Sequence, residues 1–456
     1  MFENLLGQNS AGRLIDDIVS GIFAPAVLFS GPPASGKGTA VLELGRIISC
    51  EESPFDILGA AQNAAAGLAA DKAGAAWNCA CPACARHRLL IHPDLLCLGS
   101  RQFSSEIAAS ARTFLRDTGN TSSRILFIRS VRKLLARFNP VLWEDDPKAG
   151  KIAPLVNSLE EDLDEMYLFS SPDTAGTGNG SPELEKLCEG ILKDAVKLEA
   201  EGMGETIPIA HIRRASSWCR LSPAGRGKLL VIENADLMHE EGRNSLLKLL
   251  EEPPPRVTLA LTTSKPGSLL PTILSRLRPY RFAARSPETE AEVIRRVFKD
   301  DSGGNSISAY LELFLPVSNE TLETLAAYFA SSAAYKAALI CKRQSRRIPD
   351  EVTALGKYAS SIAEEAGLGR PRGDMTAITG IVLEKADNFT VRSLFSRFLF
   401  CLLEQASRSG ARSIAYNEVW RKCVLWAGNA AGLYNIRPAQ VLEKLFTDLS
   451  RELAGL

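Results

Sequence analysis

Two clusters of residues in this chain have the types and spacing that binding chemistry requires. The first is the run GPPASGK at residues 31–37, which follows an apolar run at 26–30 and precedes a helical pattern. Glycines allow backbone N–H groups to converge on a phosphate at a helix N-terminus, where a lysine reaches the outer phosphates. The sequence therefore predicts a P-loop in which Gly31, Gly36 and Lys37 bind a nucleotide.

This P-loop departs from the usual pattern at one position. A Ser or Thr after the lysine normally holds Mg²⁺, and here that position is Gly38. Thr39 is a nucleotide-binding candidate, but it lies one residue further on, rotated by ~100° about the helix. We therefore expect binding of ATP and Mg²⁺ to be weak or absent. The alternative interpretation is a glycine-rich turn with a surface lysine.

The second cluster places three cysteines, Cys79, Cys81 and Cys84, within six residues. Cys81 and Cys84 have the C-x-x-C spacing of a zinc knuckle, and Cys50 with Cys79 would complete a four-cysteine site. Four thiolates leave Zn²⁺ no open position, so its role would be structural. Four reduced thiols are the alternative, but packing alone explains such close spacing poorly, and we favour zinc.

Composition limits the remaining classes of function. The chain has 456 residues, with 53 Lys and Arg against 53 Asp and Glu, so no global charge draws it to nucleic acid or membrane. No apolar run approaches eighteen residues, and the N-terminus does not resemble a signal peptide. Ten cysteines without an export signal indicate reduced thiols or a metal. We expect a cytoplasmic protein without membrane contact.

The elements that would position these residues belong to a parallel sheet. An apolar run at 229–232 is followed by Glu233-Asn234-Ala235-Asp236, then by a helical pattern at 244–250 and a second apolar run at 257–262. Apolar runs of this length are typical of buried parallel strands, and ligands bind at the carboxyl ends of such strands. The pattern predicts an α/β nucleotide-binding fold.

Residues 100–205 interrupt this pattern. A basic helix is predicted at 124–138 and an acidic one at 155–169, and the two are expected to pair as a hairpin. A link rich in Ser, Gly, Thr and Pro follows at 170–182. The basic face offers a DNA-binding alternative, but a solvated or internally paired face is the preferred interpretation. Beyond Phe282 the pattern is helical throughout.

Several motifs occur together in the order of a known family. The motifs are Phe2-Glu3-Asn4-Leu5-Leu6-Gly7-Gln8, the P-loop, the cysteine cluster, His92-Pro93-Asp94, Asn244 to Pro254, Thr262-Thr263 and Ile273-Leu274-Ser275-Arg276. Through these motifs the chain resembles the bacterial DNA polymerase III clamp-loader subunits, an AAA+ family, and most closely those of the delta-prime type.

The resemblance implies three domains. An AAA+ P-loop domain would span residues 1–283, with the cysteine cluster at 50–84 and a mostly helical insertion at about 100–205. A helical lid would span 284–350 and a helical collar for oligomerisation 351–456. The insertion has no counterpart in the family pattern.

The resemblance also implies roles for single residues. Glu233 matches the acid that holds Mg²⁺, whereas Asn234 stands where the family has the acid that activates water. Thr262 matches the residue that senses the γ-phosphate. Arg276 matches an arginine finger that acts in trans on ATP held by the neighbouring subunit.

Among the cysteines, Cys50, Cys81 and Cys84 match three zinc ligands of the family. The family's remaining ligand falls at Asn78, one residue before Cys79. A second nucleotide-sensing arginine in a Gly-Ser-x-Arg motif has no clear match.

Two functions follow from the resemblance. The first is a delta-prime-like, non-hydrolysing scaffold that joins gamma/tau and delta subunits in a hetero-pentameric ring. It would supply Arg276 during ATP-driven loading of the sliding clamp onto primed DNA. The second is an ATP-hydrolysing gamma/tau-like motor subunit. Gly38, Asn234 and the unmatched lid arginine favour the scaffold.

Overall fold

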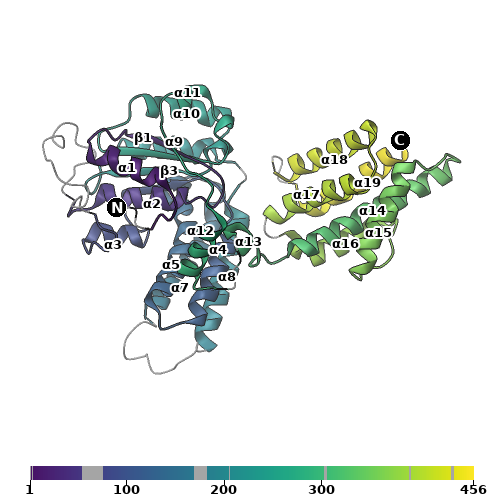
Figure 1. Ribbon diagram of the computed structural model, residues 1–456, viewed down its shortest axis with the longest axis horizontal. Coiled ribbons are helices and arrows are strands. Elements are labelled where there is room, and N and C mark those ends of the chain that lie inside the picture. Colours follow the sequence, from purple (N-terminus) through teal and green to yellow (C-terminus); the bar gives the residue numbers. More distant parts are fainter. Residues whose placement is uncertain are drawn as a thin grey trace. The chain divides into compact units, whose positions relative to one another are not determined.

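The computed structural model describes residues 2, 4–53, 75–168, 182–204, 206–301, 304, 306–389, 392–432 and 436–456. The chain divides into two compact units, residues 1–314 and 315–456 (Figure 1). All of the predicted link at 170–182 except Pro182 lies outside the described residues. The division falls inside the predicted lid at 284–350, and the three-domain arrangement stays a prediction.

The first unit is built on one parallel sheet, with the order β2-β3-β4-β1-β5 among the described residues. Every residue of the first four strands is buried, as expected for a parallel sheet covered on both faces. The edge strand β5 was not predicted, because only Tyr280 within it is buried and it forms no apolar run. The strands are β1 (Ala26–Ser30), β2 (Leu95–Leu98), β3 (Lys228–Ile232), β4 (Val257–Thr263) and β5 (Arg278–Arg281).

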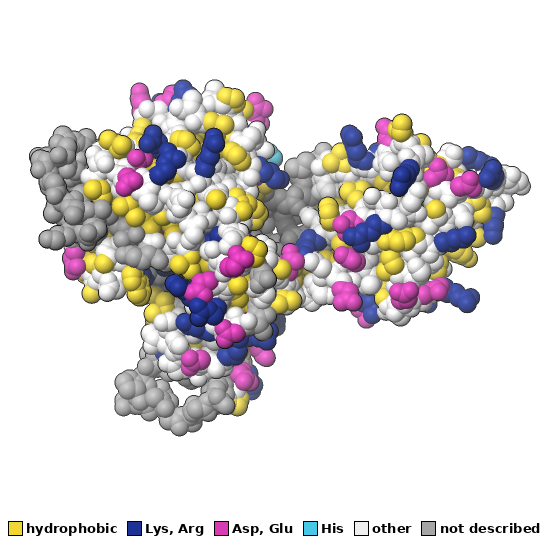
Figure 2. Space-filling view, viewed as in Figure 1, with side chains coloured by type: hydrophobic (Ala, Val, Ile, Leu, Met, Phe, Trp, Pro, Cys, Tyr) yellow, Lys and Arg dark blue, Asp and Glu magenta, His cyan; other side chains and the backbone are white. Residues whose placement is uncertain are grey.

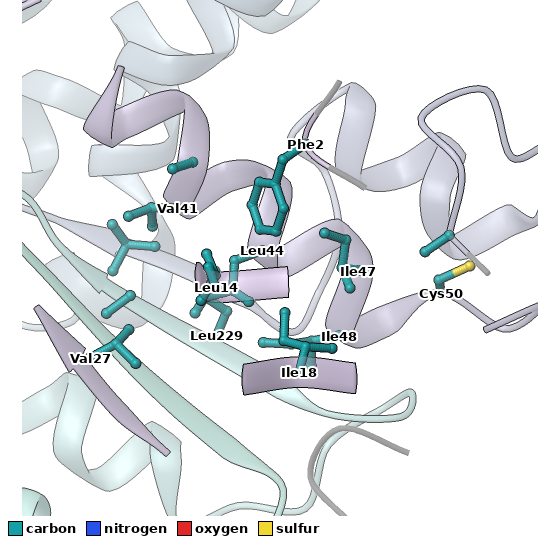
Figure 3. Packing of buried hydrophobic residues seen from close by; sticks show 14 of the residues in the cluster. Phe2, Leu14, Ile18, Val27, Val41, Leu44, Ile47, Ile48, Cys50 and Leu229 are labelled. Atoms are coloured by element: carbon teal, nitrogen blue, oxygen red, sulfur yellow. The ribbon is translucent and has the colours of Figure 1, made fainter. Parts of the chain in front are cut away.

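Helices cover both faces of this sheet. On one face, α1 (Asn9–Val19) packs against β5 and α2 (Lys37–Ser49) against β1 and β3, and Leu14, Leu44, Val27 and Leu229 belong to one buried cluster (Figure 3). On the other face lie α9 (Ile209–Cys219) and α10 (Glu240–Glu251), which bury Leu246 against Leu230 and Leu259. Each buried leucine contributes about 1.5 to 3 kcal/mol relative to an exposed one. The shorter elements of the sheet region are α3 (Pro82–Arg88), η5 (Ala235–Leu237), η6 (Pro266–Ser268) and α11 (Pro271–Leu274).

The insertion is helical, as predicted, but its helices pair differently. The basic helix, α5 (Thr121–Leu135), packs mainly against α4 (Ser104–Arg116). The acidic helix, α7 (Ala149–Leu168), packs mainly against α8 (Pro182–Gly202). The predicted pairing of the basic helix with the acidic helix is therefore wrong. Burial of Leu159, Leu163 and Ile191 in a common core outweighs attraction between exposed charges. The elements are α4 (Ser104–Arg116), α5 (Thr121–Leu135), η3 (Ala136–Phe138), α6 (Pro140–Trp143), α7 (Ala149–Leu168) and α8 (Pro182–Gly202).

Two further helices join the insertion to the rest of the first unit. These are α12 (Pro287–Phe298) and α13 (Ile307–Glu312). Phe298 and Tyr310 pack with Ala109 of α4, and the Phe298 carbonyl accepts hydrogen bonds from Thr113 (3.0 Å) and Arg116 (2.7 Å). The insertion is therefore fastened to two regions of the first unit, the sheet and the helices that follow it.

The second unit consists of helices in its described residues. The central helix α14 packs against α15, α17 and α19, and the Phe329 ring makes edge contacts with Phe398 and Phe446. The elements are α14 (Asn319–Arg343), α15 (Asp350–Glu365), α16 (Met375–Lys385), η7 (Asp387–Phe389), α17 (Arg392–Arg408), α18 (Ile414–Gly432) and α19 (Pro438–Ala454).

Charges of both signs lie interspersed over the face shown in Figure 2, in agreement with the balanced composition. Within the described parts of the chain, none of the helices has the length and apolar character needed to span a membrane.

The core of the insertion gives a first testable prediction. Leu159 is fully buried, and Leu159→Ala should lower the free energy of unfolding of the first unit by about 2 to 5 kcal/mol. Leu221 is 65% exposed, so the matched change Leu221→Ala should cost at most about 0.5 kcal/mol. Urea unfolding measures both values. Equal values would show that the insertion core does not stabilise this unit.

Candidate nucleotide site and cysteine cluster

The predicted P-loop connects β1 to α2, as expected. A Cβ atom on Gly31 would lie 2.4 Å from the Phe282 carbonyl oxygen, so any side chain here would displace the backbone. Gly36 has φ +96°, and a Cβ there would meet the Arg285 guanidinium at 2.7 Å. Both glycines are therefore required by the loop conformation and by the close approach of residues 282–285.

The P-loop lysine contacts its own loop. The Lys37 amino group donates hydrogen bonds to the carbonyls of Gly31 (2.7 Å) and Pro32 (2.6 Å). Burial lowers the pKa of Lys37 to about 8, although the negative charges of Glu233 and Asp236 oppose this shift. Lys37, which is predicted to reach the outer phosphates, thus hydrogen-bonds to carbonyl groups of its own loop.

The residue after the lysine faces the predicted Mg²⁺ acid. A Cβ on Gly38 would lie 3.5 Å from Glu233 Oε1, which places position 38 beside this carboxylate. A serine or threonine hydroxyl at position 38 would share a cation with Glu233, but glycine supplies none. Thr39 is half-buried on the next position of α2, and its role stays a prediction.

Glu233 follows β3, is largely buried and is held by two arginines. Arg101 Nε lies 3.2 Å from Glu233 Oε1, and Arg137 Nη2 donates to Glu233 Oε2. Burial alone would raise the pKa of Glu233, but the charges of Arg101 and Arg137 outweigh burial and lower it. The carboxylate is therefore ionised and already paired. We call Arg101 and Arg137 the arginine pair.

Neighbouring groups fix the arginine pair. Glu106 accepts a hydrogen bond from Arg101 Nη2 (2.8 Å) and another from Lys133. The Phe103 ring centroid lies 4.3 Å from the Arg101 guanidinium carbon and 5.5 Å from that of Arg137. Arg101 lies in the loop between β2 and α4, and Arg137 lies in η3. The basic pattern at 124–138 includes Arg137, but nothing in it indicated the contact with Glu233.

Asn234 and Thr262 are brought together by a hydrogen bond, and the roles that the family resemblance implies for them stay predictions. The Asn234 backbone N–H donates to Thr262 Oγ1 (3.2 Å), and the Asn234 side-chain amide donates to the Ser100 carbonyl (2.9 Å). An amide cannot take a proton from water, so Asn234 cannot act as a general base. Its contacts instead tie the end of β3 to the start of the insertion.

Arg276 lies at the surface, apart from these contacts. Its Nη2 lies 2.6 Å from Glu251 Oε1, and its Nη1 donates to the Thr272 carbonyl (2.7 Å). The Arg276 side chain is 34% exposed and that of Glu251 is 49% exposed. Solvent competes for such a pair, so the guanidinium can exchange Glu251 for another anion at small cost.

The four predicted cysteines meet at one site. Cys50 follows α2, whereas Cys79, Cys81 and Cys84 lie before or within α3, and their Sγ atoms all lie within 4.8 Å of one another. All four are buried, while Asn78 is exposed. Cys79, and not Asn78, therefore completes the cluster. A tetrahedral site with Zn–S bonds of ~2.3 Å has S–S distances of about 3.8 Å, so the cluster could hold a metal ion.

A buried arginine supports this cluster. Arg46 donates to Cys84 Sγ (3.3 Å) and to the carbonyls of Ala75 (2.6 Å) and Ala76 (2.9 Å), and it is also paired with Glu43. The hydrogen bond with Cys50 and burial raise the pKa of the Cys84 thiol, and the positive charge of Arg46 opposes this rise. The sequence did not indicate the contact between Arg46 and Cys84, because nothing in the helical pattern distinguishes Arg46 from other helical arginines.

His92 and Asp94 form a hydrogen-bonded turn. The Asp94 backbone N–H donates to His92 Nδ1 (3.1 Å), and the Asp94 carboxylate accepts from the N–H groups of Ala224 (2.9 Å) and Gly225 (2.7 Å). These contacts give both side chains a structural role.

The parallel sheet with helices on both faces, the P-loop between β1 and α2 and the helical regions that follow form an α/β P-loop fold consistent with an AAA+ domain. Residues 165–286 match the family described as DNA polymerase III, delta subunit. The chain resembles clamp-loader subunits of DNA polymerase III and is most like the delta-prime subunit.

Three relatives illustrate this similarity. The chain is 43% identical to the delta' subunit of Bacillus subtilis over 174 residues, which cover 32% of this chain and 52% of the relative. It is 31% identical to the delta' subunit of Pseudomonas aeruginosa over 120 residues (26% and 37%). It is 25% identical to the gamma/tau subunit of Mycobacterium tuberculosis over 173 residues (33% and 30%). The matches therefore span about half or less of each relative.

A solved structure of a DNA polymerase III gamma subunit-related protein from Thermotoga maritima also matches. It covers 55% of this chain and 81% of that chain, at 18% identity and a TM-score of 0.28. This likeness is too low to support a conclusion about this chain.

The charge network around the arginine pair gives a prediction of pH dependence. Burial would raise the pKa of Glu106, but Lys133 and Arg101 outweigh it and lower the pKa from 4.5 to about 2. This lowered pKa contributes stability that is complete above about pH 4.5 and is lost as pH falls towards about 2. Glu106→Gln should therefore flatten the pH dependence of the unfolding free energy between these values.

The same change should cost about 2 to 3 kcal/mol at pH 7. Denaturant unfolding at several pH values measures both effects, with the exposed Glu160→Gln on α7 as the control. An unchanged pH profile in Glu106→Gln would contradict the ion pairing.

Proposed function

We propose that the chain is a delta-prime-like subunit of the DNA polymerase III clamp loader. It would be a non-hydrolysing AAA+ scaffold that joins gamma/tau and delta subunits in a hetero-pentameric ring. In the cytoplasm, this ring would load the sliding clamp onto primed DNA at the expense of ATP. The single observation that carries the proposal is the ion pairing of Glu233 with Arg101 and Arg137, because Glu233 stands at the Mg²⁺-holding acid of the family pattern.

Two features of the site argue against hydrolysis in this chain. Position 38 has no hydroxyl to share a cation with Glu233, and position 234 has no carboxylate to activate water. Phosphoryl transfer depends on a positioned metal ion and a positioned nucleophile, and each of these features removes one contribution.

The surface position of Arg276 supports a role in trans. An arginine finger must leave its own subunit and reach the γ-phosphate on a neighbour. The contact with Glu251 is exposed on both sides, and such pairs contribute only about 0 to 1 kcal/mol. Arg276 can therefore be supplied to a partner at little cost to this chain.

The alternative is an ATP-hydrolysing motor of the gamma/tau type. Lys37 and Thr262 favour it, since both stand at positions that active family members use. Substitutions at Lys37 and at Arg276 separate the two functions, because a motor needs its own P-loop and a scaffold needs only its finger.

Arg276→Ala should lower the ATPase rate of the assembled clamp loader. Loss of a finger costs ~10³-fold or more at the site it serves, and the total rate falls by that site's share. Lys37→Ala should leave the rate nearly unchanged, and so should Arg281→Ala, which removes another exposed arginine. The rings are reconstituted with each variant and assayed on primed DNA with the clamp. An essential Lys37 and a dispensable Arg276 would identify a motor.

We also propose that the cysteine cluster holds one structural Zn²⁺, bound by Cys50, Cys79, Cys81 and Cys84. Four buried sulfurs within 4.8 Å of one another and the adjacent Arg46 support this ion. Four thiolates would close its coordination sphere and join the end of α2 to α3.

Protein prepared without chelator should contain about one zinc per chain by elemental analysis. Cys81→Ser with Cys84→Ser should remove the zinc and lower the melting temperature of the first unit. Cys97→Ser, which changes a buried cysteine outside the cluster, should retain the metal. Wild-type protein without metal would contradict the proposal.

A further inference from the structure

We propose that the guanidinium groups of Arg101 and Arg137, both supplied by the insertion, take the place of the divalent cation at the P-loop site. The arginine pair occupies Glu233 and thereby excludes Mg²⁺–nucleotide from this chain. The inference extends the proposed non-hydrolysing function, on which it rests for the identity of the site. It assigns a role to a segment that the family pattern leaves without one.

The first step in the argument is the position of Glu233. Its carboxylate lies beside Gly38 at the N-terminus of α2 and close enough to Lys37 to affect the lysine's pKa. This is the place at which a P-loop acid and the hydroxyl after the lysine would share Mg²⁺. Both Glu233 oxygens are already engaged, Oε1 by Arg101 and Oε2 by Arg137.

The second step is charge. Mg²⁺ requires oxygen ligands in near-octahedral geometry, and a guanidinium offers only N–H donors. Arg101 also pairs with Glu106, which Lys133 contacts as well, so these three cations and two carboxylates carry one net positive charge, which repels a dication. Arginine stays protonated at any physiological pH, so this charge cannot be titrated away.

The third step is rigidity. Arg137 is 9% exposed, and its carbonyl accepts a hydrogen bond from Trp143 Nε1 (2.8 Å). Arg101 is held by Glu106 and by the Phe103 ring. Further along, α4 is bound to the Phe298 carbonyl through Thr113. The arginine pair therefore belongs to a packed body and is not a set of mobile surface side chains.

The fourth step distinguishes this arrangement from a simple loss of the Mg²⁺ ligand. If the missing hydroxyl at Gly38 were the only obstacle, the carboxylate would remain available to a cation. The insertion instead contributes two cations to it from positions 36 residues apart in the sequence (137 − 101 = 36). The proposal therefore predicts that restoring the hydroxyl alone is insufficient.

Binding of Mg²⁺–ATP to the full chain tests the proposal by isothermal titration calorimetry, with EDTA present in a parallel series. The wild type and Gly38→Ser should show no Mg²⁺-dependent binding. Gly38→Ser combined with Arg101→Gln and Arg137→Gln should bind Mg²⁺–ATP with an affinity at least about tenfold above the detection limit that bounds Gly38→Ser alone. Gly38→Ser with Arg132→Gln is the control, since Arg132 belongs to the insertion but contacts Tyr167.

Two results would overturn the proposal. One is strong Mg²⁺–ATP binding by Gly38→Ser alone, and the other is no gain in the combined variant when its circular dichroism matches that of the wild type. If the combined variant does not fold, Gly38→Ser with Arg101→Gln replaces it. Arg101 is 27% exposed, and its loss should give a smaller but Mg²⁺-dependent gain.

A measurement on the wild type needs no variant. Hydrogen exchange at residues 31–38 should be the same with and without millimolar Mg²⁺–ATP, and protection of these amides would overturn the proposal. The ring assay of Arg276→Ala reports on the proposed function separately. If the arginine pair fails to exclude Mg²⁺–ATP, the outcome of the Arg276→Ala assay is unaffected. If Arg276→Ala has no effect on the ring, the binding result for the arginine pair is likewise unaffected.

Discussion

A carboxylate largely buried at the end of β3 must be paired, because an isolated buried charge is strongly unfavourable. Glu233 is paired with Arg101 and Arg137, and much of the first unit follows from this requirement. The insertion must dock on the sheet to deliver both arginines. The hydrogen bond from the Asn234 side chain to the Ser100 carbonyl joins the insertion to the end of β3, and the bond from Trp143 to the Arg137 carbonyl fixes Arg137 within the insertion.

The P-loop shows that a backbone conformation and its chemistry are separable. Gly31 is needed because the Phe282 backbone approaches it closely, and Gly36 is needed because its φ is +96°, whatever the loop binds. The chemistry depends instead on side chains around Glu233, and these provide guanidinium groups where a hydrolysing site requires a hydroxyl and a metal ion. A recognisable P-loop is therefore evidence of fold and only weak evidence of hydrolysis.

The limits of sequence reasoning follow the same division. Strands β1, β3 and β4 were predictable because buried parallel strands are continuous apolar runs, and the cysteine cluster was predictable from its spacing. Strand β5 has too few buried residues to form such a run. The contacts of Glu233 join residues 96 and 132 positions apart (233 − 137 and 233 − 101), and no local periodicity records such pairs.

Two arginine–glutamate contacts in this chain differ in exposure, and exposure decides what each can do. The Arg276–Glu251 pair is at the surface, where breaking it costs at most about 1 kcal/mol. Arg137 and Glu233 are only 9% and 15% exposed, and removing one partner of a buried pair costs about 3 to 5 kcal/mol. The Arg276–Glu251 contact can therefore break at small cost, as the proposed role in trans requires, while Arg137 stays in place. This asymmetry suits a subunit that contributes to a neighbour's nucleotide site and keeps its own site closed.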